Sequence, residues 1–187
     1  MVLLHTPPGE IGSPAADFSL LGVDERIHTL ADYRECTILV MMFICNHCPY
    51  VKSVEERLIQ LTRELQSRGV GFIGINSNDP TNYPEDSFEN MQKRAIEKNY
   101  PFDYLFDITQ QTARDYGAVC TPDFFVFDAQ RALRYRGRLD DSPRNPIMVK
   151  KQELRQAILN LLEGKPVPEP QNSSMGCSMK WKGEPPG

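Results

Sequence analysis

An unbroken apolar run, Ile38–Ile44, is the feature that most limits how this chain can fold. The run is too short to cross a membrane, and it suits a strand that is buried on both faces of a sheet. Apolar residues then recur at steps of three and four over residues 51–65, which predicts an amphipathic helix. The sequence C-N-H-C, Cys45–Cys48, lies between the two, so a pair of cysteines stands at a strand–helix junction.

This junction favours redox chemistry. Free N–H groups and the dipole at a helix N-terminus stabilise an anion such as a thiolate. We expect Cys45 to lie at the helix cap, to be the more exposed sulfur and to have the depressed pKa. Cys48 should lie one turn deeper and form a disulfide with it. A protonated His47 would stabilise the Cys45 thiolate further, favour the dithiol and make the pair a better oxidant.

The longer sequence F-I-C-N-H-C-P-Y-V-K, Phe43–Lys52, resembles the thioredoxin superfamily. It is most similar to the peroxiredoxin-like (AhpC/TSA-like redoxin) branch with a CxxC motif, whose members are described as thiol-disulfide isomerases or thioredoxins. The resemblance runs from Pro14–Phe18 to Gly176–Lys182. It implies an α/β thioredoxin fold, with a central mixed sheet flanked by helices, an N-terminal β-hairpin extension and a peroxiredoxin-like insertion over 76–106.

The resemblance also assigns roles to residues. Thr121 and Pro122 match the family's loop whose proline is cis and whose preceding residue pairs with substrate backbone. C-x-H-C resembles the active sites of protein disulfide isomerase and DsbA, which implies a potential on the oxidising side of thioredoxin's roughly -270 mV. Thioredoxin's buried aspartate in the central strand has no counterpart in Leu39–Met41. The group that accepts the Cys48 proton is therefore open, with three candidates: Lys52, Glu55 and Asp123.

We expect a single thioredoxin-like domain over 1–164, followed by a Pro-rich linker and C-terminal tail over 165–187. Residues 1–14 should lie over the surface, and the basic run Arg131–Arg138 should form a solvated strand. The strands on either side of the first helix should be parallel. The expected elements are a hairpin over 18–30, a strand over 38–44, a helix over 51–65, a strand over 70–75, a helix over 85–98, a strand over 101–106, a short helix over 109–116, a hairpin over 124–137 and a helix over 150–163.

Composition narrows the class of protein. With 187 residues, the chain is long enough for one domain with a sizeable core. Its net charge of -4 does not indicate binding to nucleic acid or to an anionic membrane, which would favour an excess of basic residues. No signal peptide or transmembrane segment is predicted, so we expect a cytoplasmic protein, in which disulfides are usually transient and catalytic. An odd number of cysteines, 5, also argues against a structural disulfide framework.

Three further cysteines lie outside the C-N-H-C motif. Cys36, at the start of the central strand, is expected to be a packing residue. Cys120 should lie near the active site because it precedes Pro122 by two residues; it is an auxiliary thiol or, the favoured alternative, a buried apolar group. The linker lets Cys177 reach Cys45, so it is a third redox cysteine or, the favoured alternative, an inert thiol on a tail docked by Trp181.

The sequence therefore predicts a thiol-disulfide oxidoreductase, with Cys45 as nucleophile and Cys48 as resolving thiol. We expect no cofactor besides the Cys45–Cys48 disulfide. The expected partners are protein or small-molecule disulfides and thiols, and an electron donor that the sequence does not name. No nucleic acid or membrane partner is expected, and the chain should be a monomer or weak dimer.

Two other functions are kept as alternatives. A peroxiredoxin-like thiol peroxidase would carry the motif P-x-x-x-T-x-x-C. When Cys48 is aligned with the cysteine of that motif, Cys45 stands in place of the Thr and Met41 in place of the Pro, so both helper residues are missing. A metal-binding or assembly protein would use Cys45, His47 and Cys48. It ranks last and no metal is expected, because zinc needs two further ligands at workable spacing. The remaining Cys and His residues are isolated in the sequence: Cys120, Cys177, His5 and His28.

Overall fold

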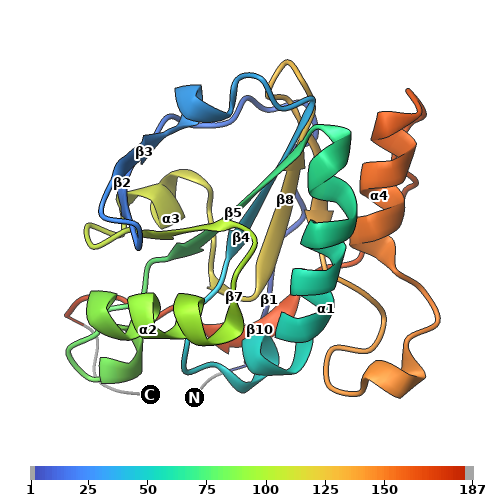
Figure 1. Cartoon of the computed structure of the whole chain (residues 1–187). Coiled ribbons are helices and arrows are strands. Elements are labelled where there is room, and N and C mark those ends of the chain that lie inside the picture. Colours follow the sequence, from blue (N-terminus) through green and yellow to red (C-terminus); the bar gives the residue numbers. More distant parts are fainter. Residues whose placement is uncertain (1–2, 184–187) are drawn as a thin grey trace.

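A seven-stranded mixed sheet forms the centre of the computed structural model, which describes residues 3–183 (Figure 1). Its strands are β2 (Ser19–Gly22), β3 (Ile27–Thr29), β4 (Ile38–Phe43), β5 (Val70–Asn76), β6 (Asp103–Phe106), β8 (Asp123–Phe127) and β9 (Leu133–Gly137). Across the sheet their order is β3-β2-β6-β5-β4-β8-β9. β4 is parallel to β5, and β2–β3 and β8–β9 are antiparallel hairpins, as predicted.

Helices cover both faces of this sheet. They are α1 (Pro49–Leu65), α2 (Phe88–Lys98), α3 (Gln111–Asp115) and α4 (Glu153–Leu162). α1 and α4 lie side by side on one face, and α3 lies on the other (Figure 1). The predicted insertion, 76–106, contains a 3-10 turn (Pro84–Asp86), α2 and β6.

β4 is the strand around which the core is built, because all six of its residues are buried. Val40 and Met42 pack with α1 and α4, whereas Leu39 and Met41 pack in a second core on the opposite face. Each fully buried side chain of this kind stabilises the fold by about 1.5–3 kcal/mol. The apolar run therefore becomes a two-sided central strand, which fixes where its C-terminal end, and the cysteine motif, must lie.

A second, three-stranded sheet was not predicted. It consists of β1 (Leu3–His5), β7 (Cys120–Thr121) and β10 (Met175–Ser178), in the order β1-β10-β7. β10 is antiparallel to both of its neighbours and lies below the main sheet in Figure 1. The N-terminal segment and the tail are thus hydrogen-bonded to each other and to the loop that carries Thr121.

The prediction that the basic run forms a solvated strand was wrong, because every residue of β9 except Arg134 is buried, including Arg136. This side chain is buried on β9, donates a hydrogen bond of 2.9 Å to Asp123 Oδ2 and lies over the ring of Phe125. The neighbouring Arg134 is exposed, as expected. Arg136 is buried because the adjacent strand, β8, offers a carboxylate inside the second core, and a paired arginine tolerates burial that an unpaired one does not.

The burial of Asp123 should make stability depend on pH. Burial raises the pKa of this carboxyl from 3.8 to about 7, although Arg136 opposes the rise. Between these two pH values the folded protein holds a proton on Asp123 that the unfolded chain releases. The stabilisation that this proton gives the fold is fully present below pH 3.8 and is lost as the pH rises to about 7. The free energy of unfolding of the wild type, relative to Asp123→Asn, should therefore fall by up to about 1.4 kcal/mol per pH unit.

Urea unfolding of both proteins at several pH values in that window measures this slope. Asp141→Asn is the matched control, because backbone N–H groups of Lys151 and Lys150 lower the pKa of Asp141. Its difference from the wild type should be constant above about pH 5. A constant difference for Asp123→Asn as well would show that Asp123 is ionised in the folded protein at all these pH values.

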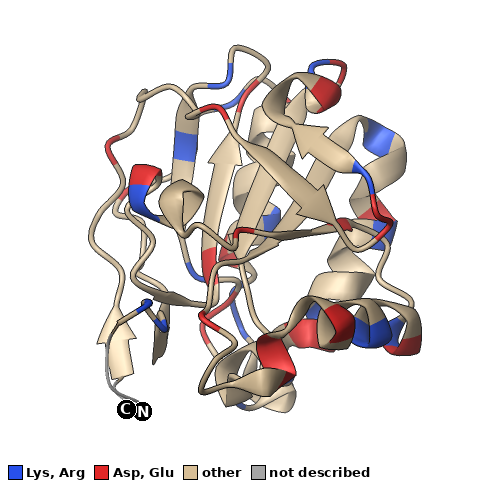
Figure 2. Ribbon diagram, turned by 90° about the vertical axis from the view of Figure 1, so that its left-hand side faces the viewer, with Lys and Arg blue, Asp and Glu red and all other residues tan. Residues whose placement is uncertain are grey.

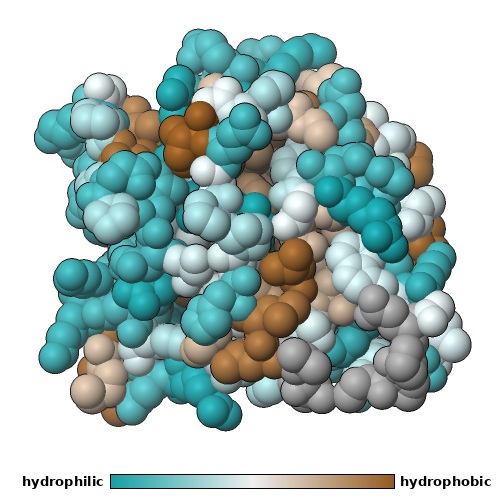
Figure 3. Space-filling model, turned by 180° about the vertical axis from the view of Figure 1, so that it is seen from behind, coloured by the Kyte–Doolittle hydropathy of each residue, from teal (hydrophilic) through white to brown (hydrophobic). Residues whose placement is uncertain are grey.

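The faces of the molecule seen in Figures 2 and 3 are mostly polar. Figure 2 shows acidic and basic residues interspersed, and Figure 3 shows a largely hydrophilic face on which hydrophobic residues form small patches. Within residues 3–183, no helix has the length and apolar character needed to span a bilayer. The expected oligomeric state and absence of nucleic acid partners stay predictions.

Candidate active site

The two cysteines of the motif lie between β4 and α1, but the helix cap is Cys48 and not Cys45. α1 begins with Pro49 at its first position, where the missing N–H costs no hydrogen bond. The residue before it, Cys48, is therefore the N-cap. The prediction that Cys45 occupies the cap was wrong because the proline, rather than the first cysteine, sets the start of the helix.

Both sulfurs are covered in this structure. Cys45 is 2% exposed and Cys48 is 0% exposed, so the expected difference in accessibility is very small. Burial raises the pKa of Cys45 well above its usual value, and the neighbouring Cys48 and Asp86 add to the rise. Hydrogen bonds from Cys177 and Cys45, together with the Val51 N–H of the first helical turn, lower the pKa of Cys48. The lowered pKa therefore belongs to Cys48 and not, as predicted, to Cys45.

Thr121 touches both sulfurs. Its Oγ1 is 3.2 Å from Cys45 Sγ, and its carbonyl oxygen is 3.2 Å from Cys48 Sγ. The bond between Thr121 and Pro122 is cis, as the resemblance implied. The loop before β8 therefore meets the cysteine motif as predicted. However, the strand edge expected to bind substrate backbone is covered, because Thr121 pairs with Cys177 of β10.

His47 is held next to Cys45 by a buried carboxylate that the sequence did not point to. His47 Nδ1 lies 2.5 Å from Asp86 Oδ2 and 3.8 Å from Cys45 Sγ. The imidazole also stacks on Tyr83, with ring centroids 4.6 Å apart. His47 is therefore fixed within reach of Cys45 and is not a freely exposed residue of the first turn.

Asp86 organises the turn that contains the motif. It is fully buried, and its Oδ1 accepts hydrogen bonds from the backbone N–H groups of Asn46 (2.7 Å) and His47 (3.2 Å). Its Oδ2 accepts from Asn78 Nδ2 at 2.9 Å, in addition to the contact with His47 Nδ1. A charged acceptor with several partners is among the stronger polar interactions in a protein interior. Asp86 thus connects the insertion to the backbone between the two cysteines.

One group of possible metal ligands occurs among the described residues. Cys45, His47 and Asp86 each offer an atom within 4.8 Å of the others. Their polar atoms also hydrogen-bond to one another and to the backbone. The expectation that no metal is bound stays a prediction.

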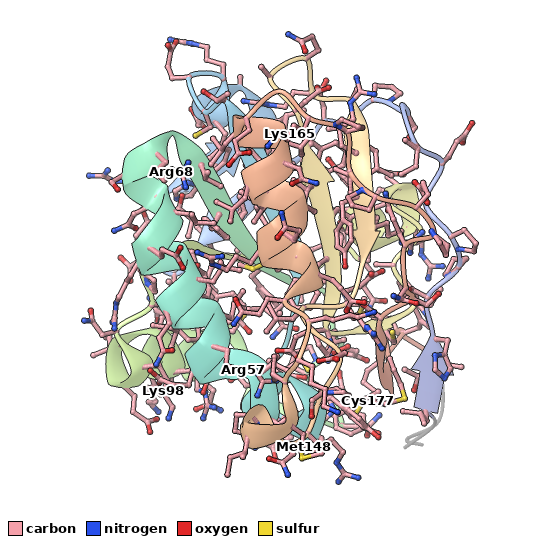
Figure 4. All side chains as sticks on the ribbon, turned by 90° about the vertical axis from the view of Figure 1, so that its right-hand side faces the viewer. Arg57, Arg68, Lys98, Met148, Lys165 and Cys177 are labelled. Carbon is pink, nitrogen blue, oxygen red and sulfur yellow. The ribbon has the colours of Figure 1, made fainter. Side chains whose placement is uncertain are left out.

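Cys177 lies at the centre of the site. Its Sγ is 2.9 Å from Cys48 Sγ and it is 1% exposed. In Figure 4 the chain runs from Lys165 at the upper end of the molecule to Cys177 at the lower end, where α1 begins. The guanidinium of Arg114 lies 4.4 Å from the ring centroid of Trp181, so the tail is docked by that residue as considered from the sequence.

The other sequence candidates lie further from the chemistry. Cys120 is buried on β7, and burial raises the pKa of its thiol. Cys36 is half-buried at the edge of the second core. Within the described part of the chain, none of the three candidate proton acceptors has a side chain that hydrogen-bonds to the Cys48 sulfur: Lys52 is exposed, Glu55 binds Arg94 and Tyr100, and Asp123 binds Arg136.

Comparison with known proteins identifies the class. A mixed sheet flanked by helices, with a cysteine motif between the central strand and a helix, defines a thioredoxin-fold redoxin. The chain belongs to the AhpC/TSA family, which matches residues 11–136, more than half of its length. The predicted fold class and family are therefore confirmed. Among curated proteins, no relative matches this chain.

Several solved structures resemble the whole molecule. An uncharacterised conserved protein from Geobacillus kaustophilus is 48% identical, with a TM-score of 0.94 and 99% of each chain covered. A hypothetical protein from Sinorhizobium meliloti is 36% identical, with a TM-score of 0.92, over 96% of this chain and 99% of that one. A thiol:disulfide interchange protein from Chlorobium tepidum shares the fold at 18% identity, with a TM-score of 0.62 over 81% and 97%.

Proposed function

We propose that this AhpC/TSA family member is a thiol-disulfide oxidoreductase whose redox centre is Cys45 and Cys48. The observation that carries the proposal is that both sulfurs contact Thr121, each at 3.2 Å. Two thiols held next to a helix N-terminus can alternate between dithiol and disulfide by thiol-disulfide exchange. The substrates would be protein or small-molecule disulfides and thiols, and the cofactor is the disulfide itself.

The reaction proceeds through a mixed disulfide at Cys45. In the oxidising direction, a substrate thiolate attacks Cys45 Sγ of the Cys45–Cys48 disulfide, and Cys48 leaves as a thiolate. A second substrate thiolate then attacks the substrate sulfur, which releases the substrate disulfide and the Cys45 thiolate. In the reducing direction the same steps run backwards, and the Cys48 thiolate attacks Cys45 to expel the reduced substrate.

The lowered pKa of Cys48 suits it to both steps. A thiol with a lower pKa is the better leaving group and is more readily ionised for the resolving attack. Stabilisation of the thiolate also favours the dithiol form, so the potential should lie on the oxidising side of about -270 mV.

A thiol peroxidase is the second candidate. The observation in its favour is that Cys48, which aligns with the peroxidatic cysteine, is the sulfur with the lowered pKa. Cys48 is nevertheless fully buried, and within residues 3–183 no arginine hydrogen-bonds to its sulfur. Peroxide chemistry would need the Cys48 sulfur to become accessible, and exchange with substrate would need the same of Cys45, which is 2% exposed.

Redox titration of the Cys177→Ser variant in glutathione buffers tests the proposal. This variant retains only Cys45 as a near partner for Cys48, so a two-electron transition should persist, and peptide mapping should find the Cys45–Cys48 disulfide. Cys120→Ser, another buried cysteine, is the matched control. Absence of a two-electron transition in Cys177→Ser, with thiols lost only to peroxide, would overturn the oxidoreductase assignment in favour of the peroxidase.

A further inference from the structure

The tail strand β10 is shaped to lie against the active site. Gly176 faces the Thr121 carbonyl so closely that a Cβ at this position would be 1.9 Å from the oxygen. Only glycine allows the two strands to approach to this distance. The pairing places Cys177 opposite Thr121, the residue that contacts both sulfurs of the motif. β10 therefore brings a third thiol to the dithiol by specific backbone contacts.

The two sulfurs Cys48 Sγ and Cys177 Sγ are in direct contact. Their separation is 2.9 Å, and both residues are at most 1% exposed. Reacting atoms in productive complexes lie roughly 3–3.5 Å apart, so this contact is close enough for attack. Cys48 thus has two thiol neighbours, and it can form a disulfide with only one of them at a time.

We propose that Cys177 is a third redox-active cysteine, which exchanges with the Cys45–Cys48 disulfide to form a Cys48–Cys177 disulfide. Cys177 Sγ attacks Cys48 Sγ; the Cys48–Cys177 bond forms as the Cys45–Cys48 bond breaks. Cys45 leaves as a thiolate and takes up the proton that Cys177 lost. The exchange needs no external oxidant or reductant, because one disulfide replaces another. It deepens the proposed function and depends on the Cys45–Cys48 couple for its starting disulfide.

This exchange moves the disulfide away from Cys45, the sulfur that exchanges with substrate. The Cys48–Cys177 disulfide joins the N-cap of α1 to β10 and leaves Cys45 as a free thiol. A substrate thiolate can then no longer form a mixed disulfide at Cys45, because Cys45 no longer belongs to a disulfide. Cys177 thereby acts as an internal thiol substrate. The protein stays oxidised as the Cys48–Cys177 disulfide until the reverse exchange forms the Cys45–Cys48 disulfide again.

Disulfide mapping of the Cys45→Ser variant tests the proposal. The full-length variant, in a Cys36→Ser, Cys120→Ser background, is equilibrated with glutathione disulfide, acid-quenched, alkylated and digested without reductant. We expect the peptide pair joined through Cys48 and Cys177 to be the main oxidised species. The same background with both Cys45→Ser and Cys177→Ser should give only glutathione adducts.

The outcome that overturns the proposal is a Cys45→Ser variant whose Cys48 is glutathionylated or stays reduced under conditions that oxidise the wild type. Cys45→Ala is mapped in parallel, so that a folding defect of one substitution does not decide the result. The wild type, trapped at successive times after oxidation, should show the Cys45–Cys48 pair first and the Cys48–Cys177 pair later. Loss of the couple in Cys177→Ser would instead overturn the proposed function, so the two failures are distinguishable.

Discussion

Replacing Cys48 with serine should lower the rate of catalysed disulfide reduction by at least roughly a thousandfold. Cys48 is the residue that resolves the mixed disulfide at Cys45, and its sulfur lies against the Thr121 carbonyl and Cys177 Sγ. An attacking group that is part of the same site can act with an effective concentration of up to about 10⁵ M or more, far above millimolar glutathione. Serine keeps the size of the side chain but does not attack a disulfide.

The measurement is turnover of a small disulfide at a fixed concentration of electron donor. Cys120→Ser and Cys36→Ser serve as controls, because each replaces a cysteine that lies outside the sulfur cluster, and both should keep nearly the full rate. A Cys48→Ser variant within tenfold of the wild type would contradict the assignment of Cys48 as the resolving thiol.

Replacing Asp86 with alanine should destabilise the protein by about 3–5 kcal/mol, the cost of removing one partner from a buried charged network. Asp86 is fully buried, and the groups it accepts from would be left without their acceptor. Those donors are the backbone N–H groups of Asn46 and His47, the Asn78 side-chain amide and His47 Nδ1. Since two of them form the turn between the cysteines, the redox couple should be disturbed together with the stability.

Urea unfolding at neutral pH gives the free energy of unfolding for this comparison. Glu85→Ala is the matched control: its side chain is exposed and adjacent, and the change should stay within about 0.5 kcal/mol. Asp86→Asn should fall between the two, because its carbonyl can still accept from the backbone while its amide faces other donors. A loss below about 1 kcal/mol for Asp86→Ala would show that the network contributes little.

The main sheet could be predicted because its signals are local. The run 38–44 and the three-to-four spacing over 51–65 lie in consecutive residues, so a strand, a helix and their order follow from the sequence. β1, β7 and β10 could not be predicted in this way. They are two to four residues long, and their pairings join Leu3 to Cys177 and Cys177 to Thr121, segments that share no local pattern.

The contact between the cysteine motif and the Thr121–Pro122 loop could be expected from the sequence, but the electrostatics around it could not. Asp86 comes from the insertion, 40 residues beyond Asn46, and no spacing rule connects an acidic residue in a loop to the motif. The lowered pKa of Cys48 depends on Cys177, whose position only the folded tail reveals. The one available signal was the apolar character of Met179 and Trp181 in a polar tail, which indicates docking but not its place.

The most direct test of the central claim is mass spectrometry of the Cys48→Ser variant after exposure to glutathione disulfide. If Cys45 is the sulfur that exchanges with substrate, the variant should accumulate one glutathione on Cys45 that persists, because nothing resolves it. The wild type under the same conditions should carry an internal disulfide and no lasting adduct. No adduct in the variant, or an adduct on Cys177 or Cys120 with Cys45 unmodified, would contradict the account.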